Sequence, residues 1–91
     1  LAAVFTDNFA NHCLVLSQEI LEQADLDKVL MKSLAEGLVK GSLLGNSKSR
    51  QTGVAIRGDK LSQERHLNLL TEDKRAFYEF LSNEIAKYHE L

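Results

Sequence analysis

The sequence has few of the residues from which catalytic and covalent sites are built. Its 91 residues include one cysteine, no proline, no tryptophan and three scattered histidines, His12, His66 and His89. No Gly-rich phosphate-binding loop is present, and no histidine has a second ligand type at the spacing of a metal site. We therefore predict no catalytic residues, no metal and no cofactor, and we expect the protein not to be an enzyme.

The lone cysteine, Cys13, also rules out an internal disulfide framework and favours a reducing compartment, so we expect a cytoplasmic protein. No apolar run approaches the length that crosses a bilayer, so no membrane partner is expected. The first five residues lack the basic region of a signal peptide. Because the chain begins without methionine, whether it is a fragment of a longer protein stays open.

What the sequence does contain is an ordinary apolar fraction of 44%, which argues against disorder over most of the chain. We predict one small helical domain over residues 1–91. The net charge of −2 is uneven, because residues 37–62 carry +4 and the rest of the chain carries −6. Nucleic-acid-binding domains are usually basic overall, so the charge speaks against that role as the main one.

Helical periodicity fills the first half of the chain. Apolar residues spaced by three and four predict a helix over about 7–23, with its buried stripe at Phe5, Phe9, Cys13, Leu16 and Ile20. In a helix Cys13 behaves as a small core hydrophobe, because the adjacent His12 points about 100° away and cannot share a metal ion with it. A second helix is expected from an Asp25 cap to a stop at Gly41.

The second half predicts two more helices after a loop. One runs from a Ser62 cap to Leu70, and the last begins at Thr71–Asp73, where two acids suit the helix dipole. The expected core of the whole domain draws on both halves of the chain. It consists of Phe9, Leu16, Ile20, Leu30, Leu34, Phe77, Leu81 and Ile85.

The middle of the chain, at about 41–60, is a basic Gly/Ser-rich loop. It ends in a β-favouring run, which predicts one short extended segment near residues 53–57. Gly58 is expected to take a positive φ and Asp59 to cap or pair locally, which we prefer to an adhesive role for Arg57-Gly58-Asp59. The predicted fold class is mainly α, a domain of three to four helices with that one extended segment.

Two surfaces are candidates for function. The basic loop residues could follow a phosphate backbone, although no aromatic side chain is interleaved for base stacking. Several apolar residues exceed what one small core requires, and surplus apolar surface favours a partner or self-association. Phe5, Val15 and Phe80 belong to this surplus. The candidate interaction residues are Lys48, Arg50, Arg57, Lys60, Leu43 and Leu44.

We therefore predict a non-enzymatic interaction or regulatory module that uses an apolar helical face. Its partner would be another protein or a second copy, as in a homodimer. The alternative is a nucleic-acid-binding accessory protein that uses the basic middle segment.

A further alternative comes from the string Gln-Thr-Gly-Val-Ala-Ile-Arg-Gly-Asp-Lys at 51–60, which resembles a segment of prolyl-4-hydroxylase-like oxygenases dependent on 2-oxoglutarate and Fe(II). The resemblance implies the N-terminal, non-catalytic part of such an enzyme. The chain departs from that family at Leu61-Ser62-Gln63, where a Trp-containing step is expected, and it lacks the iron ligands. No catalytic residue carries over.

Overall fold

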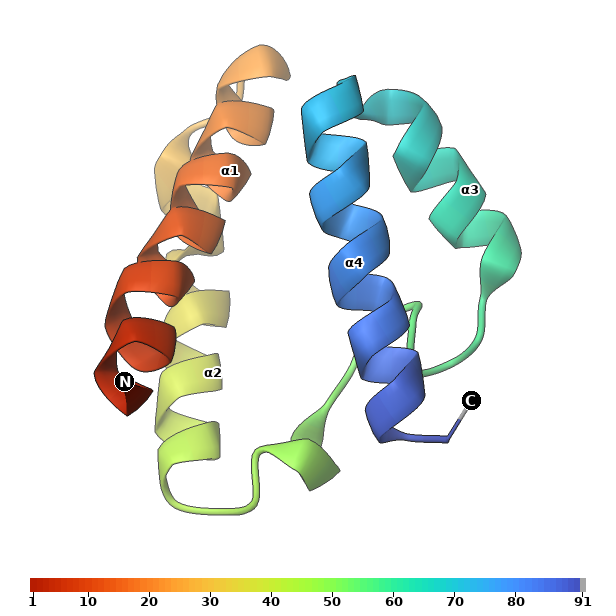
Figure 1. Cartoon of the computed structure of the whole chain (residues 1–91). Helices are drawn as coiled ribbons and strands as arrows, with labels where there is room; N and C mark the ends of the chain where they lie inside the picture. Colours follow the sequence, from red (N-terminus) through yellow and green to blue (C-terminus); the bar gives the residue numbers. More distant parts are fainter. Residues whose placement is uncertain (91) are drawn as a thin grey trace. The chain divides into compact units, whose positions relative to one another are not determined.

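The computed structural model describes residues 1–90, and four α-helices make up most of them (Figure 1). The mainly helical class is confirmed, and no strand occurs in the described part of the chain. Contacts divide the chain into two units, residues 1–45 and 46–91, whose boundary falls inside the predicted loop. Each unit is described by itself, and the single domain over 1–91 stays a prediction.

The first unit begins earlier than the sequence predicted. A π-helical turn, η1 (Val4–Phe9), leads directly into α1 (Ala10–Gln23), so Asp7 lies inside the helical segment rather than at its start. A 3-10 turn, η2 (Lys28–Met31), then leads into α2 (Lys32–Leu43). Gly41 does not stop α2, because the helix continues for two more residues.

The link between α1 and α2 corrects the predicted cap. Asp25 adopts a left-handed conformation with φ 57°, which aspartate tolerates better than most residues. The Leu26 amide donates to the Leu21 carbonyl at 2.8 Å and closes the end of α1. Asp27 is the residue that caps, since its Oδ1 accepts from the Val29 amide at 2.9 Å. The capping role that we predicted for Asp25 therefore belongs to Asp27, two residues further along the chain.

The second unit begins with η3 (Lys48–Arg50) and a closed turn. The predicted extended segment at 53–57 is wrong in detail, because these residues form a hydrogen-bonded turn. The Asp59 amide donates to the Val54 carbonyl at 3.0 Å, and Gly53 and Gly58 take φ of 104° and 64°. A lone strand would leave its backbone groups without partners, whereas the turn satisfies them locally. The positive φ predicted for Gly58 is confirmed.

Asp59 sets the start of α3 (Lys60–Leu69). Its Oδ1 accepts from the Ser62 amide at 3.0 Å, and its Oδ2 accepts from the Ser62 hydroxyl at 2.7 Å. Ser62 is therefore a donor inside the first turn, and its predicted role as the cap is wrong. The local capping role that we expected for Asp59 is confirmed.

The final helix, α4 (Glu72–Tyr88), starts where the sequence predicted, and polar contacts join it to α3. Arg75 Nε donates to the carbonyls of Leu67 at 2.8 Å and Leu70 at 3.0 Å, which satisfies the end of α3. His66 Nδ1 and Tyr78 Oη lie 2.8 Å apart, and their rings meet edge to face. These contacts hold α3 and α4 as a hairpin.

The predicted core is not buried. Among residues 1–90 only Leu21 and Ala55 fall in the buried class. Leu16 and Ile85 are half-buried, and the other six predicted core residues are exposed, as is Cys13. Those six are Phe9, Ile20, Leu30, Leu34, Phe77 and Leu81. The helices exist as predicted, but few of the apolar side chains on them are buried within their own unit.

Candidate interaction surface

The helix α1 has two apolar faces, and its neighbour in the same unit covers one of them. Leu21 is buried, and Leu14 and Ser17 line a pocket that α1 shares with η2 and α2. At 100° per residue, the residues from Phe9 to Ile20 in the predicted stripe lie about 80–140° around the helix from Leu21. We call this second face the α1 stripe: Phe5, Phe9, Cys13, Leu16 and Ile20.

The α1 stripe is largely open. Phe5 is 64% exposed, Phe9 52% and Ile20 45%, while Leu16 is half-buried. The rings of Phe5 and Phe9 contact each other edge to face, with centroids 5.0 Å apart. The stripe is therefore a row of apolar side chains in which the two aromatic rings contact each other.

A similar division holds for α2. Ala35 is half-buried and lines the pocket toward α1, whereas Leu34 and Leu38 are 71% and 66% exposed. Together with Leu30 these leucines recur every four residues, so they share one face of the helical segment. We call this face the α2 stripe: Leu30, Leu34 and Leu38. In α2, the small residue faces inward and the large ones face outward.

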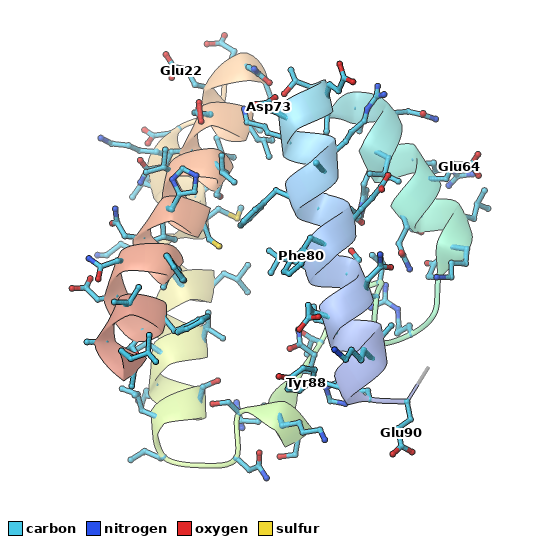
Figure 2. The ribbon with its side chains drawn as sticks, viewed as in Figure 1. Glu22, Glu64, Asp73, Phe80, Tyr88 and Glu90 are labelled. Atoms are coloured by element: carbon cyan, nitrogen blue, oxygen red, sulfur yellow. The ribbon has the colours of Figure 1, made fainter. Side chains whose placement is uncertain are left out.

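The last helix repeats the arrangement in the second unit. Tyr78 faces α3 and is half-buried, while Phe77, Leu81 and Tyr88 lie about 80° around α4 and are exposed. Phe80 widens this α4 stripe of Phe77, Leu81 and Tyr88. Figure 2 shows Phe80 on the side of α4 away from α3, and Glu64 projecting outward from α3.

The pocket in the first unit is open and mainly apolar. It has a volume of about 340 Å³, with Asp27, Lys28 and Lys32 beside the apolar part of its lining. Leu14, Val29 and Met31 supply much of that apolar surface. In residues 1–90 no group of three or more His, Cys, Asp or Glu side chains could hold a metal ion. The pocket is a gap between α1, η2 and α2 within the first unit.

Exposed large apolar side chains occur in both units. Isolated apolar residues on a surface are ordinary, but rows of them mark sites of association. The α1, α2 and α4 stripes are rows of this kind.

The predicted interaction residues fall into both units. Leu43 and Leu44 lie at the end of α2 in the first unit, and Leu44 is 89% exposed. The basic residues Lys48, Arg50, Arg57 and Lys60 are exposed positions of the second unit. Binding by either group stays a prediction. Phe5, Val15 and Phe80, which we expected to exceed the needs of one core, are all exposed.

Sequence reasoning placed the α1 and α4 stripes correctly but assigned them to an internal core. The spacing of a helix stripe is the same whether its partner lies within the chain or outside it. The sequence did carry one signal, because its apolar residues outnumbered what one small core requires. The predicted core residues that are exposed instead are Phe9, Ile20, Leu30, Leu34, Phe77 and Leu81.

Three titratable groups are perturbed, all in the second unit. The hydrogen bonds from the Ser62 hydroxyl and amide lower the pKa of Asp59, and the hydroxyl of Thr71, whose Oγ1 lies 2.6 Å from Asp73 Oδ1, lowers the pKa of Asp73. Burial raises the pKa of Tyr78, and the charge of Asp59 adds to that effect. Each of these pKa shifts arises from a hydrogen bond that caps a helix or from the packing of α4 against α3.

No helix in residues 1–90 is long and apolar enough to cross a membrane.

Comparison with known proteins connects this arrangement to a family. Residues 1–85 match the family model of a domain of unknown function, DUF2520. The whole chain also superposes on the crystal structure of a "putative NADP oxidoreductase" from Bacteroides fragilis, with 38% sequence identity and a TM-score of 0.90. The chain spans 35% of that protein's length. No curated protein matches.

These findings overturn the resemblance to prolyl-4-hydroxylase-like oxygenases. That resemblance depended on about five residues around Arg57-Gly58-Asp59, which form a turn and a helix cap here. The family match covers 85 residues and the structural match covers all of the chain. Short strings that encode a glycine turn recur in unrelated proteins for the same local reason.

Proposed function

We propose that this chain, which belongs to the DUF2520 family, is a non-enzymatic interaction module that associates through its apolar helical stripes. The observation that carries the proposal is the exposure of most of the large apolar residues among 1–90, many of them in rows on the helices. Water contact with so much apolar surface is unfavourable by about 25 cal/mol for each Å². A partner that covers the stripes removes that cost.

We also propose that the module is the helical part of a longer protein related to NADP oxidoreductases. The support is the match to about a third of the length of the Bacteroides fragilis protein. A dinucleotide is usually held by a Gly-rich turn between a strand and a helix, and this sequence contains no such motif. We assign any NADP binding and any redox chemistry to the remainder of the longer protein. The lone Cys13 supports a reducing compartment such as the cytoplasm.

The test is the mass of the protein in solution, measured by sedimentation equilibrium over a hundredfold range of concentration. We expect a species heavier than the monomer, or a complex with the remainder of the longer protein when the two are mixed. Leu34→Asp together with Leu38→Asp should weaken the association without loss of helicity, because aspartate cannot be buried there without a partner. A matched control is Leu69→Asp, an exposed leucine of α3 outside the three stripes. A monomer that unfolds cooperatively and binds nothing at any concentration would overturn the proposal.

A further inference from the structure

We infer that the pocket between α1, η2 and α2 binds a small molecule with an apolar body and one carboxylate, as in a medium-chain fatty acid. The inference goes beyond the proposed function, because it assigns a ligand to a pocket within the first unit and needs no second copy. Three observations carry it: the size of the pocket, its mainly apolar walls and the charges that line it.

The size of the pocket suits a small molecule rather than a segment of another protein. Its volume of about 340 Å³ lies at the lower end of the range of about 300–1,000 Å³ that ligand pockets have. One turn of an α-helix, about 10 Å wide and 5.4 Å high, occupies about 420 Å³, so a helix of a partner does not fit. A slender aliphatic chain does.

The apolar part of the lining comes from both sides of the pocket. Leu14 belongs to α1, whereas Val29, Met31 and Ala35 belong to η2 and α2. Leu14 and Val29 are 44% and 58% exposed, so a ligand that fills the pocket removes apolar surface from water. None of these residues belongs to the α1 stripe or the α2 stripe, so the ligand and a protein partner would contact different side chains.

The charged part of the lining favours an anionic group on the ligand. Lys28, Lys32 and Asp27 line the pocket, so two positive charges and one negative charge give a net charge of +1. Asp27 is already engaged, because its Oδ1 accepts from the Val29 amide at 2.9 Å. Lys32 lies 3.7 Å from Glu36 in an exposed pair, which is weak in water and gives way to a better placed anion. One net positive charge balances a carboxylate better than a phosphate dianion.

Titration of the whole chain with octanoate tests the inference, and octan-1-ol serves as a neutral ligand of the same length. Amide chemical shifts in NMR spectra report where each compound binds, and their concentration dependence gives the dissociation constant. We expect the largest shifts for both compounds at residues 14–18 and 27–35, which hold the lining of the pocket. Shifts of equal size along the α1 stripe or in the second unit would indicate binding to any apolar surface and would overturn the site.

Two variants separate the charge of the pocket from its volume. Lys28→Gln together with Lys32→Gln should raise the dissociation constant of octanoate about tenfold and leave that of octan-1-ol unchanged. The control, Lys40→Gln with Lys48→Gln, removes the same charge at exposed positions outside the lining and should change neither constant. Ala35→Leu fills the pocket and should abolish binding of both compounds.

Circular dichroism of each variant checks that its helices are retained. An octanoate constant that is equal in the unchanged protein and in the Lys28 and Lys32 variant would overturn the assignment of a carboxylate. Undiminished binding to a folded Ala35→Leu variant would show that the pocket is not the site.

Discussion

At the scale of single residues, the second unit depends on a few polar side chains in defined roles. Asp59 caps α3, Arg75 satisfies the end of the same helix, and Tyr78 joins α4 to His66. Each acts on a backbone end or on a neighbouring helix within its own unit. Since few apolar side chains are buried, we expect these polar contacts to contribute much of the stability of the second unit.

The cap formed by Asp59 predicts a pH dependence. Its pKa is lowered in the folded state, so the stabilisation is present above the ordinary carboxyl pKa of about 3.9 and is lost as the pH falls through the lowered value. Asp59→Ala should lower the melting temperature at pH 7 and flatten its decline toward acid. Asp59→Asn, which also caps well, should keep most of the stability at pH 7. Equal melting curves for Asp59→Ala and the unchanged protein would contradict this role.

Tyr78 predicts a second, alkaline effect. Burial raises its pKa above 10.0, so the folded state holds the phenolic proton more tightly than the unfolded state does. Its stabilisation is complete below pH 10 and is lost as the pH rises through the raised pKa. In a Tyr88→Phe variant, Tyr78 is the one remaining phenol, and its ultraviolet absorbance should titrate above pH 10. A transition at or below pH 10 would show that Tyr78 is not held against α3 as described.

At the scale of elements, the regular helices have apolar faces that are not buried within their own unit. Between α1 and α2 the small side chains of Ser17 and Ala35 lie beside Leu14, Val29 and Met31, while Leu34 and Leu38 are exposed. In the second unit a glycine turn stands where the sequence predicted an extended segment, and it leads directly into α3. The elements are therefore specified by local signals, whereas many of their large apolar residues stay exposed.

Two glycines, one in a turn and one inside a helix, test whether these elements have the described backbone conformation. Gly58 has φ 64°, where a side chain is strained, so Gly58→Ala should lower the free energy of unfolding by about 1 kcal/mol. Gly37 lies inside α2 with open space where a Cβ would be, so Gly37→Ala should raise it by about 0.5–1 kcal/mol. Urea denaturation of both variants gives the measurement. The same sign for both changes would contradict the described turn or helix.

The sequence predicted where the helices lie much better than it predicted which of their side chains are buried. Helix periodicity and the acids at Glu72 and Asp73 located α1 and α4 because those signals are local. The cap at Asp27 was missed by two residues, and Ser62 was wrongly expected to cap α3, since Asp25 and Ser62 have equally suitable side chains. The local capping role of Asp59 was predicted correctly. Burial could not be predicted, because a stripe such as Phe9–Leu16 has the same spacing against any partner. The number of apolar residues was the signal for surplus surface.

At the scale of the whole molecule, exposed apolar rows occur in both units, and the family and structural matches run almost from end to end. If the protein associates through these rows, as we propose, its stability should depend on its concentration, as it does for obligate dimers.

This dependence is directly measurable. If two copies associate, the melting temperature should fall by about 3 °C for each tenfold dilution, because unfolding and dissociation are then coupled. Phe9→Asp should remove the dependence along with part of the stability. A melting temperature that stays constant over a hundredfold dilution of the unchanged protein would contradict association in the folded state.

The scarcity of buried residues also has a consequence for the life of the protein in a cell. If the protein works as the interaction module that we propose, a newly made chain, with only Leu21 and Ala55 buried among residues 1–90, would present its apolar rows to chaperones and proteases until a partner covers them. Copies made in excess of that partner would then be degraded or would aggregate, and the abundance of the protein would follow the supply of its partner.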